Sequence, residues 1–465
     1  MSTITSSSPA APFLAAPAPP SAPLPFLRYV RTVRQNFIAA LHEDVYRQDI
    51  VERKFVGFHS FLVNHPAGLR RVLLENVENY PKARIEHRIL GPALGNGLIL
   101  SEGETWRAHR RIMAPSFDHR TIERCAQIMT DATLKLIGHW DQLRNGTAVE
   151  LSSAMMELTL EIISRSMFSS DSDSIVEIVR AGSERYQDAM MFGLLDIVPG
   201  VGALWGIFKA RRGRTIMKAF DQAFLNVLHG RAQGTRATQF NDLLERLITT
   251  RDQQTGIAMT PREIRDQVLT IFVAGHETTA IALMWTWYLL SQHPEHEARL
   301  HAELKNVLNG RTPAFSDVAA LSFTRMVLQE SMRLYPPVYS LAFRQAAGDD
   351  EICGKRIPKG AVISIMPWVL HRHRSFWEQP DRFDPERFSS EASATRDRLC
   401  YLPFGFGPRI CIGASFATTE AVLILATIAQ RYRFHLSPGF RVEPQALFTL
   451  RARYGMSMEL ERRRR

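Results

Sequence analysis

Apolar residues recur every three to four positions from about residue 104 to residue 335, the period of an amphipathic helix. Short runs rich in β-branched and aromatic residues lie near the margins of this stretch, at 55–63, 351–357, 361–366 and 454–460. Strands and helices do not alternate, and no segment of twenty to fifty residues repeats. The pattern predicts a mainly α chain with small β-sheets and disfavours a doubly wound nucleotide-binding fold.

The best-marked helix begins after Thr260. Thr260 is a good N-cap, Pro261 suits the first helical position, and Glu263 completes a capping box. The helical period continues to about residue 292, which makes the helix roughly 45 Å long at ~1.5 Å per residue. Its centre, residues 274–279, sets a glycine beside an acid and two threonines. Two interpretations fit: a buried helix that tolerates a glycine, or a local opening beside a ligand.

A second helix is predicted from about residue 323 to residue 335, where Pro336 and Pro337 end it. It carries Glu330 and Arg333 at i,i+3, on one face. By itself such a pair is most often a solvated ion pair that contributes ~0–1 kcal/mol.

Composition places the chain among globular proteins. Hydrophobic residues make up 45% of its 465 residues and charged residues 22%, which excludes global disorder. The net charge of +10 either serves solubility or favours an acidic partner: an electron-transfer protein, a membrane surface or nucleic acid. Nucleic acid is the least favoured of these, because basic residues are dispersed and no nucleic-acid motif occurs.

The N-terminal residues 1–25 are rich in Ser, Ala and Pro, without a charged start or an uninterrupted apolar run. They predict a flexible arm, neither a secretory signal nor a membrane anchor, followed by one domain over residues 26–465. The cysteines form no CxxC pair. A disulfide framework is not expected, in keeping with a reducing cytoplasm.

The strongest chemical signal is FGFGPRICIG at residues 404–413, which precedes an apolar helix predicted up to about residue 432. Cys411 then stands at a helix N-terminus, where the dipole and free N–H groups favour its thiolate. Gly405 and Gly407 allow the loop backbone to approach a ligand closely. The alternatives are a small buried hydrophobe for the cysteine and a nucleotide loop, which the missing βαβ unit excludes.

This segment fills every specified position of Phe-x-x-Gly-x-Arg-x-Cys-x-Gly and resembles the haem-binding loop of the cytochrome P-450 family. The resemblance extends from about Tyr80 to the end of the chain. Residues 274–278 are similar to the family's oxygen-binding motif, residues 330–333 to its Glu-x-x-Arg signature, and residues 384–388 to its Pro-Glu-Arg-Phe segment. It implies one triangular-prism-like, mainly α domain around a buried haem b.

The resemblance assigns cofactor roles. Cys411 would ligate the haem iron through its thiolate, which pushes electron density toward O–O cleavage. Arg409, Arg344, Arg110 and Trp106 would bind the haem propionates, the last two as a Trp-x-x-x-Arg helix. The remaining positions are Phe404, Gly405 and Gly413 in the loop against the haem, and Glu330, Arg333 and Arg387 in a buried supporting network.

The central motif is expected to handle dioxygen and protons. Gly275 would open the helix so that dioxygen and water fit, Thr278 would order the oxygen substrate and a water, and Glu277 would relay protons from solvent. The alternatives are a salt-bridged structural acid for Glu277 and a hydroxyl that bonds the i−4 carbonyl for Thr278. His276 is expected to be buried or at the pocket edge rather than a ligand.

The implied activity is a haem-dependent monooxygenase that inserts one atom of O2 into an apolar fatty acid, terpenoid or aromatic compound. Electrons would come from NAD(P)H through a separate ferredoxin or flavodoxin and its reductase, because only about fifty residues follow Cys411. A cytoplasmic protein without a transmembrane segment is expected, with weak peripheral membrane contact left open. A peroxide-dependent peroxygenase and a haem-binding sensor or carrier are alternatives, and both are disfavoured by the Glu277-Thr278 pair.

Five histidines are candidate ligands. His293, His296 and His301 are poorly spaced for one metal and are expected on a solvated surface. His371 and His373 are candidates for a propionate or structural role.

The remaining expectations concern the substrate pocket. The apolar segment 189–208 is interrupted by glycines and a proline, which makes it a poor membrane span, and by resemblance it forms the roof of the substrate channel. Pocket-lining candidates, each also explicable as core, are Phe272, Val338, Leu341, Phe343 and Phe448.

Overall fold

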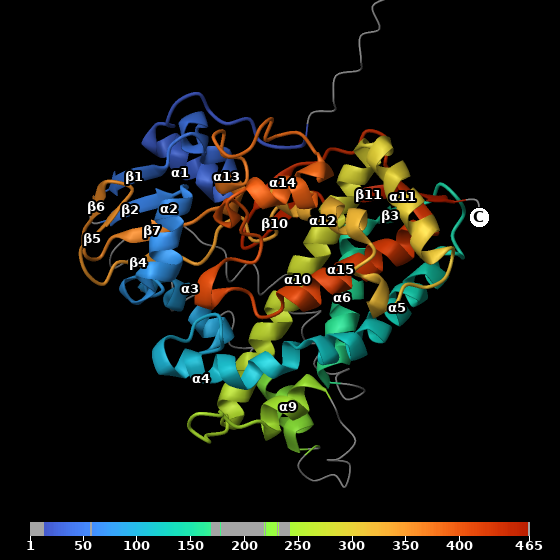
Figure 1. Cartoon of the computed structure of the whole chain (residues 1–465), viewed down its shortest axis with the longest axis horizontal. Coiled ribbons are helices and arrows are strands. Elements are labelled where there is room, and N and C mark those ends of the chain that lie inside the picture. The colour runs from blue at the N-terminus through green and yellow to red at the C-terminus, as the bar shows by residue number, and fades with distance from the viewer. Residues whose placement is uncertain are drawn as a thin grey trace, which may run out of the picture.

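The computed structural model describes residues 14–55, 58–168, 177, 218, 220–229, 231 and 242–463. The strands within residues 50–63 and 344–364 lie on one side of the molecule, and most of the long helices lie on the other, together with the strands at 148–150 and 457–462 (Figure 1). The described helices are α1 Phe26–Gln35, α2 Pro66–Arg70, α3 Arg84–Leu94, α4 Gly103–Met113, α5 His119–Trp140, α6 Leu151–Phe168, α9 Leu243–Thr249, α10 Pro261–Gln292, α11 Pro294–Leu308, α12 Ser322–Leu334, α13 Pro367–Leu370, α14 Ser390–Thr395 and α15 Ala414–Ala429. The described strands are β1 Ile50–Phe55, β2 Phe58–Val63, β3 Ala148–Glu150, β4 Arg344–Gln345, β5 Asp350–Ile352, β6 Lys355–Ile357, β7 Val362–Ser364, β8 Tyr432–Leu436, β9 Pro444–Ala446, β10 Leu450–Ala452 and β11 Ser457–Arg462. The prediction of a mainly α chain with small sheets is confirmed.

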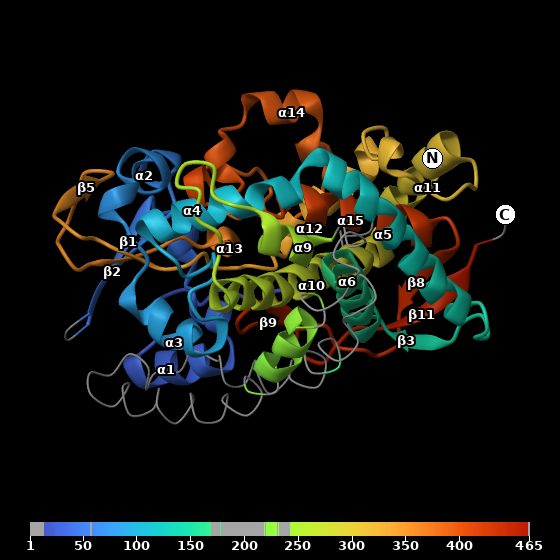
Figure 2. The ribbon, with the colours of Figure 1, turned by 90° about the horizontal axis from the view of Figure 1, so that it is seen from below.

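The central helix of the molecule is α10, which packs against α6, α12 and α15. It begins at the predicted capping box, in which Thr260 and Glu263 exchange backbone-to-side-chain hydrogen bonds. Figures 1 and 2 both show it running through the middle of the helical part. Although α10 is long and apolar enough to cross a membrane, 78% of its most apolar window is buried inside the protein. Its apolar composition is therefore explained by its place in the core.

The predicted local opening of this helix is wrong, because α10 is continuous through Gly275. The hydroxyl of Thr278 donates to the Ala274 carbonyl at 2.8 Å, and that of Thr279 donates to the Gly275 carbonyl at 3.2 Å. A Cβ on Gly275 would lie 3.3 Å from Ile163 of α6. The glycine therefore serves the close approach of two helices within an unbroken α10.

The largest sheet has the order β1-β2-β7-β4 and holds Arg344 in its edge strand. Strand β2 pairs antiparallel with β1 and parallel with β7, and β4 pairs antiparallel with β7. The four predicted strand runs correspond to β2, to the β5–β6 hairpin, to β7 and to β11. The partner strand β1 was missed because its sequence, IVERKF, carries three charged residues.

The predicted N-terminal arm is described from residue 14 onwards. There the Tyr335 hydroxyl donates to the Ala15 carbonyl at 3.0 Å, and the Glu43 N–H donates to the Pro20 carbonyl at 3.0 Å. This part of the arm therefore lies against the body of the protein. A domain boundary at residue 26 stays a prediction.

Candidate active site

A cavity of 340 Å³ lies between one face of α10, the start of α15, α4 and the loop before Cys411, and its walls are mostly apolar. It gathers most of the predicted site residues. Those that line it are Cys411, Arg409, Arg110, Trp106, Arg344, Phe404, Gly405, Gly413, Gly275 and Thr278. Cys411 and Thr278 thus border the same space although 133 residues separate them.

The loop before α15 presents Cys411 to this cavity. The Cys411 N–H donates to the Phe404 carbonyl at 2.9 Å, which closes the loop. Gly405 and Gly407 have φ angles of +72° and +74°, in the region that favours glycine. A Cβ on Gly407 would also lie 2.2 Å from the Leu73 carbonyl oxygen. The two glycines are therefore required by the shape of the loop itself.

Cys411 is accessible from the cavity, and the protein that surrounds it desolvates the thiol and so raises its pKa. The Gly413 N–H and the Arg110 guanidinium lower the pKa, as a helix start predicts, but they do not outweigh burial. The helix start therefore favours the thiolate in the predicted direction, and burial opposes it. A metal ligand must be deprotonated, so thiolate formation here is coupled to the binding of a cation at the sulfur.

Four basic side chains converge on the cavity beside Cys411: Lys82, Arg110, Arg344 and Arg409. Burial lowers the pKa of each, to about 7 for Lys82 and to about 10 for Arg409, where neighbouring cations add to the effect. The carboxylates that act on this cluster are those of Glu86 and Glu102. Three arginines and a partly protonated lysine beside two carboxylates leave positive charge that the two propionates of haem b would offset. The residues present therefore fit this cofactor.

Arg409 makes three contacts at the cavity edge. Its guanidinium lies over the Trp106 ring, 4.2 Å from the ring centroid. It also donates to the Ser101 carbonyl at 2.7 Å and pairs with Glu102 at 2.8 Å. Arg110, on the same helix as Trp106, donates to the Ile410 carbonyl at 2.8 Å and so also supports the cysteine loop.

Glu277 does not line the cavity. It is buried, ion-paired with Arg451 at 2.6 Å, and accepts a hydrogen bond from the Thr449 hydroxyl. The alternative of a salt-bridged structural acid therefore describes its position. Thr278 lines the cavity, but its hydroxyl bonds the carbonyl one turn earlier, which was the alternative weighed for it.

A second buried carboxyl, Glu420, was missed by the sequence reasoning. Glu420 is 2% exposed, and burial raises its pKa to about 8 against the effect of a hydrogen bond with Thr279, which lines the cavity. Its Oε1 has no hydrogen-bond partner among the residues that are described. The signal was present in the sequence, because Glu420 is the one charged residue in the apolar stretch of α15.

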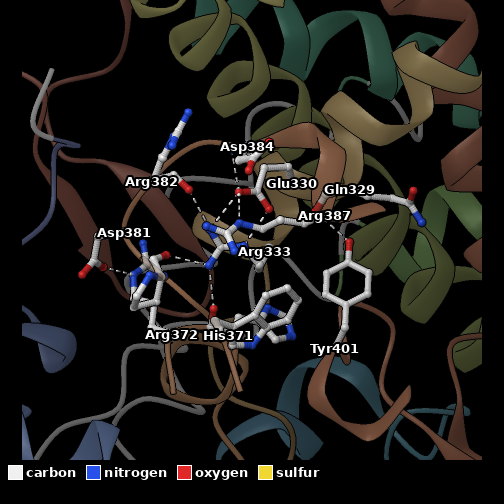
Figure 3. A network of polar contacts seen from close by, with 12 residues as sticks. Gln329, Glu330, Arg333, His371, Arg372, Asp381, Arg382, Asp384, Arg387 and Tyr401 are labelled. Atoms are coloured by element: carbon white, nitrogen blue, oxygen red, sulfur yellow. Dashed lines mark hydrogen bonds and ion pairs between the residues drawn. The ribbon is translucent and has the colours of Figure 1, made fainter. Parts of the chain in front are cut away.

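Figure 3 shows the predicted supporting network, and Glu330 and Arg333 at its centre have no exposed surface. Glu330 accepts two hydrogen bonds from Arg333, at 2.6 and 2.8 Å, and one from the Asp384 N–H at 2.9 Å. Arg387 lies 3.5 Å from the same carboxylate. The three predicted members therefore meet, and the surface ion pair weighed for Glu330 and Arg333 is excluded.

Arg333 extends this network to the segment that leads into the cysteine loop. It donates to the carbonyls of His371, Pro380 and Arg382, at 2.8, 2.7 and 3.0 Å. The His371 ring in turn accepts the Leu402 N–H at 2.8 Å. Because Leu402 lies two residues before Phe404, a continuous chain of hydrogen bonds joins α12 to the loop. His371 therefore has the structural role.

Known proteins resemble this chain along most of its length. The family model for cytochrome P-450 matches residues 17–453. Cyclooctatin synthase of Streptomyces melanosporofaciens is 35% identical over 87% of this chain and 87% of its own length. Cyclooctat-9-en-7-ol 5-monooxygenase of the same organism is 34% identical over 84% of this chain and 83% of its own. The chain belongs to the cytochrome P-450 family.

The haem domain of cytochrome P450DA, a solved structure, has a TM-score of 0.78 with 25% identity over 95% of this chain and 94% of that chain. This confirms the cytochrome P-450 fold. Membership makes the chain a haem-binding oxidoreductase that incorporates oxygen into apolar substrates, with haem b held through a thiolate.

Three expectations about histidines are settled by burial. His276 is buried, with its ring bonded to the Phe272 carbonyl at 2.6 Å, as predicted. The solvated surface expected for His293 and His301 is wrong, because each is 7% exposed. His296 is half-buried. Within the described residues, no group of metal-ligating side chains gathers around any of them.

Only some of the predicted pocket-lining residues line the cavity. Val338 and Leu341 line the cavity of this P-450, whereas Phe272, Phe343 and Phe448 do not. Phe272 points into the core, with no exposed surface. The roof predicted for residues 189–208 lies outside the described residues. The sequence did not predict that Lys82 lines the cavity, because no pattern in its segment distinguishes it.

Proposed function

We propose that this P-450 is a monooxygenase of terpenoid-sized apolar compounds, supplied with electrons from NAD(P)H by a separate ferredoxin or flavodoxin and its reductase in the cytoplasm. The observation that carries the proposal is that Cys411 and Thr278 border one mostly apolar cavity. Two relatives are named for cyclooctatin and for cyclooctat-9-en-7-ol, which supports a terpenoid as the substrate. The haem, when bound, supplies the oxygen-activating chemistry.

Separate residues of the chain bind the haem iron, neutralise the propionates and support the cysteine loop. Cys411 holds the iron, and Arg409, Arg344, Arg110 and Lys82 neutralise the propionates. The Trp106 ring lies beneath the Arg409 guanidinium and keeps it in place. The remaining haem-contacting loop positions are Phe404, Gly405 and Gly413, with Glu330, Arg333 and Arg387 as support for that loop.

Proton supply is assigned to the α10–α15 contact. Thr278 presents its side chain to the cavity, and Gly275 leaves room beside it. Glu420 holds a proton at neutral pH because its pKa is about 8, and it contacts Thr279 on the same wall. Glu277, fixed by Arg451, positions β10 against α10. Glu420 is therefore the proton-holding group that the geometry favours.

The electron donor is proposed to dock where the cysteine loop reaches the surface. Ile410 and Leu74 are each 39% exposed there, and the adjoining turn Gly407–Arg409 packs on the segment that holds Leu74. Arg107 of α4 and Arg70 of α2 are exposed and pair with the surface carboxylates of Glu104 and Asp397. Helix α4 supports this loop through Arg110, and α2 packs on the segment that holds Leu74. An apolar centre with a basic rim suits an acidic protein.

The test is turnover with purified holoprotein and a surrogate ferredoxin system. We expect terpenoid-dependent NADPH consumption together with an oxygenated product. The Cys411→Ser variant is the matched control and should consume no NADPH above background. Ligand binding without product would instead establish the sensor, and product formed only with added peroxide would establish the peroxygenase.

A further inference from the structure

One threonine on the cavity wall differs from the others. The hydroxyls of Thr278, Thr279 and Thr418 donate to the carbonyl one turn earlier in their own helices, at 2.8, 3.2 and 2.8 Å. The Oγ1 atom of Thr270, which also belongs to a cavity-lining residue, is buried and has no hydrogen-bond partner within the described part of the chain. A buried hydroxyl without a partner loses the hydration that it had in the unfolded chain, so its presence in an apolar wall calls for an explanation.

The loop that crosses α10 at this point accounts for the lost bond. The Asp266 carboxylate and the Gln267 side-chain oxygen each accept a backbone N–H from residues 95–98, at 2.8 Å. Gly97 of this loop lies so close that a Cβ on it would be 2.0 Å from the Thr270 hydroxyl. The loop therefore covers the hydroxyl without offering it an acceptor.

The position of Thr270 suits contact with a substrate. It lies on the cavity-lining face of α10, two helical turns before Thr278, or ~12 Å along the helix axis at ~1.5 Å per residue. The neighbouring wall, formed by Leu98, Ile99 and Ile271, is apolar. A compound that brings one carbon to Thr278 would therefore place its far end beside Thr270. Rotation of the Thr270 side chain by one staggered step takes the hydroxyl out from beneath Gly97, to the position now held by the methyl group or by the Cβ hydrogen.

We propose that Thr270 recognises an oxygen function, a hydroxyl or a carbonyl, on an otherwise apolar substrate. The preferred substrate is then a terpenoid that an earlier oxidation or hydration has already oxygenated once, at the end remote from the carbon that reacts. This assignment rests on the proposed monooxygenase function and narrows its substrate class. Thr270 is a specificity residue, because it orients the substrate and does not touch the reacting atoms.

The experiment compares matched pairs of an alcohol and its parent hydrocarbon. Cedrol with cedrane and ent-kauran-16-ol with ent-kaurane are titrated into the ferric holoprotein, and the spin-state change gives Kd for each compound. The ratio of the hydrocarbon Kd to the alcohol Kd measures the preference for oxygen. Thr270→Val keeps the volume and removes the hydroxyl. Thr286→Val is the control on the same helix, because Thr286 is fully buried away from the cavity and its hydroxyl bonds the Ala282 carbonyl at 2.7 Å.

We expect Thr270→Val to lower this ratio about five-fold, the size of one neutral hydrogen bond, and Thr286→Val to leave it unchanged. A Thr270→Val ratio equal to that of wild type overturns the assignment, as does an equal fall in both variants. Failure of the proposed function has a different signature: holoprotein that gives no spin-state change with any compound of either pair contradicts the apolar substrate class itself.

Discussion

Replacing Glu330 by glutamine should remove a large share of the stability of this P-450. Glu330 has no exposed surface and accepts three hydrogen bonds, two from Arg333 and one from the Asp384 N–H. Glutamine keeps the volume but loses the charge, and its NH2 group would face the guanidinium donors. Arg333, also without exposed surface, would then be a buried cation without a counter-ion.

The expected cost is about 3–5 kcal/mol, the range for removing one partner of a buried ion pair. A domain is typically stable by only about 5–15 kcal/mol. Because Arg333 also donates to three carbonyls in the segment before the cysteine loop, the loss should spread to that loop. The variant should therefore retain haem less well as well as unfold more easily.

Urea unfolding followed by circular dichroism measures the change in the free energy of unfolding, and Soret absorbance of the same samples reports haem retention. Glu161→Gln is the matched control, because Glu161 is 31% exposed and pairs with Lys135, which is 60% exposed. Its expected cost is at most about 1 kcal/mol. A Glu330→Gln variant within 1 kcal/mol of wild type, with the same slope against urea, would refute the reasoning.

The other predictions concern the cavity. Cys411→Ser should abolish the red-shifted Soret band of the reduced carbon monoxide complex, and retention of that band would exclude Cys411 as the ligand. Thr278→Val should keep substrate binding but release more of the consumed NADPH as hydrogen peroxide; full coupling of NADPH to product would contradict its role. Glu420 has its pKa raised from 4.5 to about 8, so its contribution to stability is present below pH 4.5 and is lost as the pH rises toward 8. Glu420→Gln should flatten the pH dependence of unfolding over this interval and slow turnover, whereas unchanged profiles of both would contradict a buried protonated carboxyl. Lys82→Met should speed haem transfer to apomyoglobin several-fold, since one counter-charge of the propionates is lost, and an unchanged transfer rate would remove Lys82 from the haem site.

Residue patterns that act between sequence neighbours predicted many of the local features of this fold. The capping box at Thr260 determines where α10 begins, because it satisfies the first N–H groups of the helix whatever packs around it. The glycines of the cysteine loop likewise mark positive φ angles that other residues rarely adopt. Such signals are readable because each depends on neighbours in the sequence.

Contacts between distant segments decided the rest. Glu277 and Thr278 are adjacent in sequence, yet the helix turns one toward Arg451 and the other toward the cavity. Glu420 acquires its raised pKa only because α15 is buried against its neighbours, and Lys82 becomes part of the cavity only because β4 brings Arg344 beside it. The burial of a side chain and the charges around it depend on residues that are distant in sequence but close in the folded structure. The order of residues along the chain does not show which of them come together.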